Sequence, residues 1–287
     1  MRPGWRSLLF VPANAPQRWA KAHTRGADCV IVDLEDSIPP DAKAAARPLC
    51  TEAVNALAGQ GAKVAVRVNN DPAHLAEDLN AAIGASLASV VFPKVEQPDQ
   101  LAALDGQLNA IEAARGLARG ATRVIAVIES PAAVERIAAI ANGPRLIGLC
   151  LGSEDFALSL GRQPSPLALD LVCQQVAYAA AARGLMGLGM ACGIGNFTDL
   201  DNWVIVARRA HGMGLTGALA IHPNQIAGLN AAFGASEAEV RDAQAILTAW
   251  EARTEGVVSH NGQMLDLPIV ERARRLLEAA GRATVRA

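Results

Sequence analysis

The chain has little of what several classes of protein depend on. Only ten of its 287 residues are aromatic (five Phe, four Trp and one Tyr), too few for a platform on which nucleic-acid bases stack. Neither charge is in large excess, because 26 basic residues nearly balance 28 acidic ones for a net charge of −2. A protein built to hold nucleic acid needs a basic face. The composition therefore argues against nucleic acid as a partner.

Cysteines are also few, and long apolar runs are absent. The five cysteines are an odd number without a C-x-x-C pair, which favours neither a disulfide framework nor a zinc site and is typical of a reducing cytosol. We interpret each as a small core residue and expect a cytoplasmic protein. No stretch of 18 apolar residues occurs, so no membrane partner is expected. The cysteines are Cys29, Cys50, Cys150, Cys173 and Cys192.

The N-terminal sequence MRPGWRSLLFVPANAP has the charges and small residues of a signal peptide. Its apolar run, Leu8 to Val11, is shorter than such a peptide requires, and we interpret it as a buried first strand. With 51% hydrophobic and 19% charged residues, the chain can bury a large core.

Short β-branched runs alternate with alanine-rich stretches such as 13–25 and 131–141, which are long enough for helices. Strands joined by helices are parallel, and eight such units are typical of a (β/α)8 TIM barrel. The seventh run is the weakest of the eight because glycines interrupt it. The predicted strands are Ser7–Pro12, Cys29–Asp33, Lys63–Asn69, Ser89–Pro93, Val124–Ile128, Leu146–Leu151, Met186–Cys192 and Ala218–Ile221.

The alternation ends after Pro223. Ser236 and Glu239 have the spacing of a capping box, which predicts a helix to about Arg253. A polar segment, 256–268, and a last helix, 269–280, follow. We expect a catalytic barrel over residues 1–233 and, over 234–287, C-terminal helices and a lid that packs on a neighbouring subunit.

Six of the eight predicted strands end in charged or strongly polar groups, and in a barrel these ends meet on one rim, where active sites lie. This rim is therefore the predicted active site. The residues at the ends include Asp33, Glu35, Asp36, Arg67, Pro93, Lys94, Glu129, Asp155 and His222.

Glu129 and Asp155 follow adjacent strands, the fifth and sixth. Two neighbouring carboxylates repel unless a cation lies between them, and hard ions such as Mg²⁺ or Mn²⁺ prefer oxygen ligands. We predict a metal site there, the alternative being that each carboxylate pairs with an arginine. Arg67 suits a carboxylate or a developing enolate oxygen, or else forms a salt bridge with Glu35 or Asp33, and both can hold together.

Two further patterns are less specific. Lys43 and Arg47 lie on the helix after Asp36. They would either stabilise the loop that contains Glu35 and Asp36 or be solvated charges of the helix. The glycines of 187–193 lack the G-x-G-x-x-G spacing of a dinucleotide loop, and we interpret them as tight packing around the seventh strand.

Together, RSLLFVPAN, VIVDLEDSIPPDAKAAAR, RVNN, VVFPKVE, VIAVIES, LGSEDF and GALAIHPNQI resemble the citrate lyase β-subunit-like branch of the HpcH/HpaI aldolase family. The likeness runs from about residue 6 to residue 233, and NGQMLDLP in the tail resembles the lid of that family. It implies a trimeric or hexameric TIM barrel that cleaves or forms a C–C bond in an acyl-CoA such as citryl-, malyl- or citramalyl-CoA. The products are acetyl- or propionyl-CoA and an oxo acid, so coenzyme A enters as part of the substrate.

The resemblance also implies roles for single residues. Glu129 and Asp155 would hold Mg²⁺, Arg67 would stabilise the enolate oxygen, and Asp266, on the lid, would move the proton at the acetyl carbon. Glu35 is a further catalytic candidate. Contacts with the substrate or its coenzyme A are expected at Asp33, Arg67, Pro93, Lys94 and His222.

The chain departs from the family pattern at two places. It has the neutral stretch 190–195 where an aspartate is common, and Thr216-Gly217-Ala218 where T-G-K is common. Both leave open the exact substrate and the contacts with CoA or an acyl carrier, but not the metal chemistry. The sequence does not fix the oxo acid, the stereochemistry or the direction of the reaction. Two alternatives remain: an aldolase acting on free 4-hydroxy-2-oxo acids, and a non-catalytic subunit or one that depends on citrate lyase partner subunits, which the sequence does not indicate.

Overall fold

The computed structural model describes residues 4–252 and 259–284. The chain forms two compact units, Met1–Asn230 and Ala231–Ala287, and each is described by itself. Within the part of the chain described, none of the helices combines the length and the apolar character that a membrane span needs.

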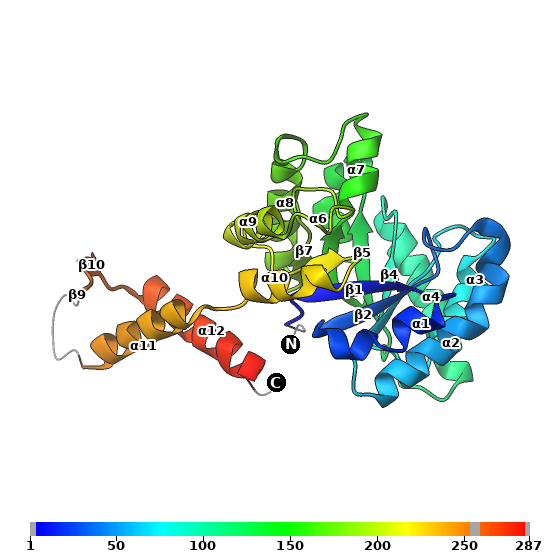
Figure 1. Ribbon diagram of the computed structural model, residues 1–287, viewed down its shortest axis with the longest axis horizontal. Helices are drawn as coiled ribbons and strands as arrows, with labels where there is room; N and C mark the ends of the chain where they lie inside the picture. Colours follow the sequence, from blue (N-terminus) through cyan, green and yellow to red (C-terminus); the bar gives the residue numbers. More distant parts are fainter. Residues whose placement is uncertain (1–3, 253–258, 285–287) are drawn as a thin grey trace. The chain divides into compact units, whose positions relative to one another are not determined.

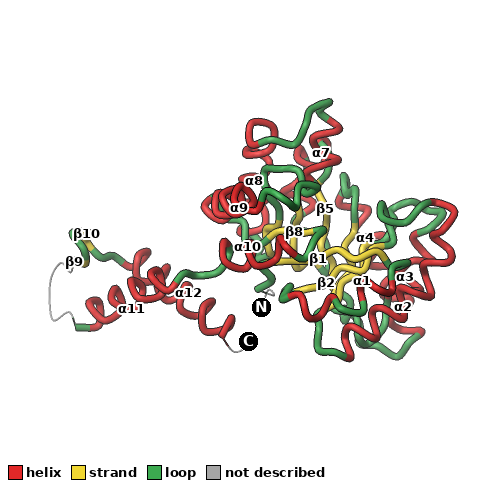
Figure 2. Tube along the Cα trace, viewed as in Figure 1, coloured by secondary structure: helices red, strands yellow, loops and turns green. Residues whose placement is uncertain are grey.

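The first unit is built around eight parallel strands (Figures 1 and 2). Their order is β7-β6-β5-β4-β3-β2-β1-β8, so each strand except the terminal pair lies beside its neighbours in sequence. A parallel bridge between Leu188 and Gly217 joins β7 to the segment before β8 and closes the ring. The predicted (β/α)8 TIM barrel is confirmed. The strands are β1 (Ser7–Pro12), β2 (Cys29–Asp33), β3 (Val64–Arg67), β4 (Ser89–Phe92), β5 (Arg123–Ile128), β6 (Leu146–Leu151), β7 (Met186–Leu188) and β8 (Ala218–Ala220).

Helices surround the strands, as the alternation predicts. The expected helix 13–25 is instead a short α-helix and a 3₁₀ turn, which Gly26 ends in the left-handed region at φ 76°. The expected helix 131–141 is also divided in two. The helical elements of this unit are α1 (Pro16–Trp19), η1 (Ala22–Arg25), η2 (Pro40–Ala42), α2 (Lys43–Gly59), α3 (Leu75–Ala82), α4 (Pro98–Ala114), α5 (Pro131–Glu135), α6 (Ile137–Ile140), α7 (Ser153–Ser159), α8 (Pro166–Ala181), α9 (Leu200–Gly212) and α10 (Asn224–Ala232).

The barrel interior is filled by apolar side chains from successive strands, among them Ile31, Ala65, Ile125 and Leu188. Because parallel strands are covered on both faces, most of their residues are apolar. The seventh strand ends at Leu188, earlier than predicted. Gly189 has φ 134°, a conformation that strands do not use, and a β-carbon there would lie 2.9 Å from Leu151 Cβ. Close packing around this strand, as the glycines predict, is therefore confirmed.

The end of the barrel where the strands begin carries a buried ion pair. Arg145 donates to both oxygens of Glu112, at 2.7 and 2.9 Å, and also contacts Asp105. The backbone N–H groups of Gly120 and Thr122 donate to the same carboxylate. Burial alone would raise the pKa of Glu112, but these bonds lower it to about 2. This cluster ties β6 to α4 away from the strand ends that carry the polar residues.

The second unit contains α11 (Glu237–Glu251), the hairpin β9 (Ser259–His260) and β10 (Gln263–Met264), and α12 (Leu267–Thr284). The predicted capping box is confirmed: Ser236 Oγ accepts from Glu239 N, and the Glu239 carboxylate accepts from Ser236 N. The last helix lies where it is predicted and is longer. Arg253 and the start of the polar segment lie outside the described residues.

Candidate active site at the mouth of the barrel

A cavity of about 440 Å³ opens where the strands of the barrel end. Of the residues predicted to form the site, Asp33, Asp36, Arg67, Glu129 and Asp155 line it. Asp33 and Arg67 are the last residues of β2 and β3, and Glu129 follows β5 directly. Asp155 lies in the first turn of α7, which begins after β6. Closing the barrel thus brings together side chains that are up to 122 positions apart in the sequence.

Arg67 is held by three carboxylates. Its Nε and Nη2 each donate to Asp33 at 2.7 Å, in the two-pronged geometry that suits a guanidinium and a carboxylate. Nη1 lies 2.9 Å from Glu35 Oε2 and 3.0 Å from Asp36 Oδ2. The predicted salt bridge is confirmed. Arg67 also lies over the ring of Phe10, with Cζ 4.7 Å from the ring centroid, a favourable arrangement for a cation.

These contacts fix the charges of the pair. Burial by itself would lower the pKa of Arg67, but the bonds to Asp33 and the charges of Glu35 and Asp36 raise it above its usual value. Burial would raise the pKa of Asp33, and the guanidinium outweighs it, so that this pKa lies below its usual range. Both groups are therefore ionised at neutral pH.

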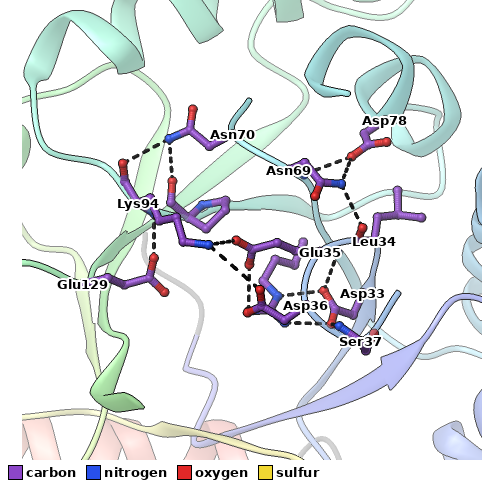
Figure 3. A network of polar contacts seen from close by, with 12 residues as sticks. Asp33, Leu34, Glu35, Asp36, Ser37, Asn69, Asn70, Asp78, Lys94 and Glu129 are labelled. Atoms are coloured by element: carbon purple, nitrogen blue, oxygen red, sulfur yellow. Dashed lines mark hydrogen bonds and ion pairs between the residues drawn. The ribbon is translucent and has the colours of Figure 1, made fainter. Parts of the chain in front are cut away.

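Arg67 and its three carboxylate partners form what we call the Arg67 cluster. Lys94 links this cluster to Glu129 (Figure 3). Its ammonium lies 2.5 Å from Glu35 Oε1, and its backbone N–H donates to Glu129 Oε2 at 2.7 Å. Lys94 adopts φ 52°, in the left-handed region that non-glycine residues seldom occupy. Burial raises the pKa of Glu35 although Arg67 and Lys94 oppose it.

Glu129 is 7% exposed and lies against Gly152. Burial and the nearby negative charge of Glu35 raise its pKa to about 7, and Asp155 contributes in the same direction. A β-carbon at position 152 would lie 2.5 Å from Glu129 Oε1, so only glycine leaves room for this carboxylate. The repulsion between Glu129 and its acidic neighbours is what a bound cation would relieve.

The donors in the cavity fit a divalent cation with oxygen ligands. Five carboxylates line it, against two guanidinium groups, those of Arg18 and Arg67. Among the described residues, no group of three or more His, Cys, Asp or Glu side chains is placed to hold a metal. A site at Glu129 and Asp155 would therefore be completed by water or substrate oxygens, which suits Mg²⁺. The acidic residues are Asp33, Asp36, Glu129, Glu154 and Asp155.

The other predicted site residues lie beside the cavity or in the second unit. The Pro93 carbonyl accepts from Asn70 Nδ2 at 2.7 Å, and His222 stacks on Phe197 with ring centroids 4.5 Å apart. Asp266 is exposed and precedes α12, where its Oδ1 accepts from Ile269 N at 3.1 Å. Contacts of Pro93, Lys94 and His222 with a substrate stay predictions.

The sequence did not point to several residues of the cavity. Arg18, an exposed residue of α1, lines it, and no strand end marks that position. Cys192 also lines it and is only partly buried, so the interpretation of this cysteine as a core residue is wrong. Burial of Cys192 raises the pKa of its thiol to about 12, so it stays protonated.

The fold and the site together define a TIM barrel with a cavity at its mouth that is lined by acidic side chains. A model of the HpcH/HpaI aldolase/citrate lyase family matches residues 6–223, and the chain belongs to this family. Citrate lyase subunit beta of Leuconostoc mesenteroides subsp. cremoris is 30% identical over 282 residues, 96% of this chain and 93% of that protein. The L-malyl-CoA/beta-methylmalyl-CoA lyase of Cereibacter sphaeroides is 32% identical over 300 residues, 96% of this chain and 94% of that protein.

A solved structure is also similar to this chain over nearly its full length. Protein CitE of Mycobacterium tuberculosis, in complex with magnesium, acetoacetate and coenzyme A, matches with a TM-score of 0.77 and 29% identity. The match covers 96% of this chain and 97% of that one.

Proposed function

We propose that this protein is a Mg²⁺-dependent carbon–carbon lyase. It cleaves an acyl-CoA that carries a hydroxyl and a carboxylate on C3, such as citryl-, malyl- or citramalyl-CoA, into acetyl- or propionyl-CoA and an oxo acid, and it forms the same bond in reverse. The observation that carries the proposal is the placement of Glu129, Asp155 and Arg67 around one cavity. The full-length likeness to a citrate lyase subunit and a malyl-CoA lyase supports it.

Glu129 and Asp155 are the residues that hold the metal in this proposal. When bound, Mg²⁺, or Mn²⁺ in its place, supplies Lewis-acid polarisation of the oxo-acid carbonyl. Gly152 leaves the space in which the Glu129 carboxylate lies, and Lys94 N–H fixes one of its oxygens. The other oxygen, Oε1, is then available as a ligand.

Arg67 stabilises the enolate that cleavage leaves on the thioester. A guanidinium has five N–H donors, and three of those of Arg67 donate to Asp33 and Asp36, which leaves an N–H on Nη2 that none of the described carboxylates accepts. A donor that is already fixed where negative charge develops needs no reorganisation during the reaction. Both oxygens of Asp33 bind Arg67, so Asp33 acts on the substrate through that residue. Glu35, held between Arg67 and Lys94, supports the same geometry.

We assign the transfer of the proton at the acetyl carbon to Asp266. This residue lies in the second unit, and we propose that the unit acts as a lid on a neighbouring subunit of a homotrimer or hexamer. Exclusion of water by such a lid would favour proton transfer between this carboxyl group and the substrate. Pro93, Lys94 and His222 are the proposed contacts for the coenzyme A-bound substrate outside the cavity.

The test is to incubate the purified protein with Mg²⁺, acetyl-CoA or propionyl-CoA, and glyoxylate, pyruvate or oxaloacetate in separate pairs. Mass spectrometry should detect a hydroxyacyl-CoA with one pair, which EDTA and Glu129→Ala both abolish. Cleavage of free 4-hydroxy-2-oxo acids without coenzyme A would instead indicate an aldolase. Binding of Mg²⁺ and acyl-CoA without any product would indicate a subunit that depends on partners.

A further inference from the structure

The segment 33–37, which comprises the end of β2 and the loop after it, is held by side chains that lie outside the cavity. The peptide C=O of Leu34 accepts from Lys43 Nζ at 3.1 Å and from Asn69 Nδ2 at 2.8 Å. Leu34 N donates to Arg67 O at 2.9 Å. Lys43 is 9% exposed and Asn69 is 4% exposed. Buried donors from α2 and from the end of β3 therefore fix the middle of this segment.

Asn69 is itself fixed by a buried carboxylate on α3 (Figure 3). Asp78 Oδ2 accepts from Asn69 N at 3.0 Å and from Asn69 Nδ2 at 2.6 Å. Arg47 Nε donates to the other oxygen at 2.9 Å. Asp78 is fully buried, and a buried carboxylate is tolerated only with such partners. Lys43, Arg47, Asn69 and Asp78 form what we call the buried brace.

Asp33 connects the segment held by the brace to Arg67. Asp33 accepts from Glu35 N and Ser37 N, at 3.0 and 3.2 Å, and holds Arg67 with both of its oxygens. A displacement of Leu34 would therefore move the Asp33 carboxylate and rotate the guanidinium bound to it. A two-pronged pair transmits direction as well as charge, so a small rotation moves the remaining N–H of Arg67 away from its target.

We propose that the buried brace positions Arg67 for catalysis through the 33–37 segment. This inference rests on the proposed function. None of the four side chains lines the cavity formed by the described residues, so the brace acts through the Leu34 peptide rather than on the substrate. Misplacement of a reacting group by about 1 Å costs roughly a hundredfold in rate. Loss of the brace should therefore lower kcat and leave substrate and metal binding intact.

The first test is Asn69→Leu, which keeps the size of the side chain and removes both of its amide donors. We expect kcat to fall about 10- to 100-fold. KM for acetyl-CoA and the Kd for Mg²⁺ should stay within about twofold, since Glu129 and Asp155 are not part of the brace. The matched control is Glu77→Gln, because Glu77 also contacts Arg47 from α3 but is exposed, and this variant should behave as the wild type.

Hydrogen exchange gives a readout that does not depend on turnover. In Asn69→Leu, the amides of the 33–38 segment should exchange faster, while those of β6 keep the protection of the wild type. Faster exchange throughout the barrel, with kcat, KM and metal affinity worsening together, would show a merely structural role and overturn the proposal. Unchanged kcat and unchanged exchange would also overturn it.

Two further results separate the possible failures. If wild-type protein turns over no pair of acyl-CoA and oxo acid, the proposed function fails, and the exchange data still decide whether the brace holds the loop. If Asn69→Leu does not fold, Lys43→Met removes the other donor to Leu34. That variant should lose kcat, and Lys43→Arg, which retains donors, should recover part of it; equal activity in the two variants would contradict the proposal.

Discussion

Gly152 lies so close to Glu129 that a β-carbon at position 152 would be 2.5 Å from Glu129 Oε1. The two residues follow adjacent strands, β5 and β6, and Gly152 N donates to Ile128 O at 3.0 Å. The backbone cannot easily move away, so a side chain at position 152 would displace the carboxylate.

Gly152→Ala should therefore weaken Mg²⁺ binding by about 10- to 100-fold, the range seen when residues that orient a metal ligand are changed. Isothermal titration with Mg²⁺ or Mn²⁺ measures this. Gly195→Ala is the matched control, since nothing lies within 4 Å of a β-carbon there. Unchanged affinity in Gly152→Ala would argue against Glu129 as a ligand.

Arg67→Lys keeps the positive charge and loses the two-pronged contact with Asp33. We expect kcat to fall about 10²- to 10³-fold, as when one oriented donor to a developing oxyanion is removed, with Mg²⁺ affinity unchanged. Steady-state kinetics on the substrate pair found for the wild type provide the measurement.

Arg6→Lys is the control for this change. Arg6, just before β1, makes the same kind of two-pronged contact with Asp28, just before β2, at 2.9 and 3.1 Å. Its kcat should match that of the wild type. An equal loss of kcat in both variants would mean that Arg67 stabilises the fold and has no special part in the reaction.

Glu112→Gln tests the ion pair at the other end of the barrel. Breaking a buried pair costs about 3 kcal/mol of unfolding free energy, which urea denaturation at pH 7 would measure. In the folded protein the pKa of Glu112 is about 2, below its ordinary 4.5, so the contribution is complete above pH 4.5 and is lost as pH falls toward 2. The difference from wild type should shrink below pH 4.5. A difference that is constant with pH would contradict this account.

Asp266→Asn separates the catalytic and structural roles of this residue. Asparagine caps helices as well as aspartate does, so the start of α12 should be retained while the titratable group is lost. We expect a fall in kcat of about 10²-fold or more, with no change in melting temperature. Wild-type kcat in this variant would remove Asp266 from the mechanism.

The sequence predicts the barrel well because its buried parallel strands are continuous apolar runs. Three strands, Ser7–Pro12, Cys29–Asp33 and Leu146–Leu151, have the predicted bounds. The seventh ends early because Gly189 leaves the extended conformation, which a run of glycine and apolar residues does not reveal.

In the site, the expectation that functional side chains lie where the strands end identifies the residues that line the cavity from the ends of β2, β3, β5 and β6. It does not find Arg18, which reaches the cavity from a helix, nor Phe10 beneath Arg67, which depends on how the barrel closes. The left-handed backbone of Lys94, whose N–H donates to Glu129, leaves no pattern in the sequence either.

The central claim is that two carboxylates and Arg67 cleave a C–C bond in an acyl-CoA with the help of a divalent ion. Its most direct test is cleavage of synthetic malyl-CoA, citramalyl-CoA and citryl-CoA by purified protein, with acetyl-CoA release followed by mass spectrometry at increasing Mg²⁺. We predict release from at least one thioester that saturates with Mg²⁺, disappears with EDTA and is absent in Glu129→Ala and Asp155→Ala. Release that persists without a divalent ion, or no release from any of the three by folded, Mg²⁺-loaded protein, would contradict the account.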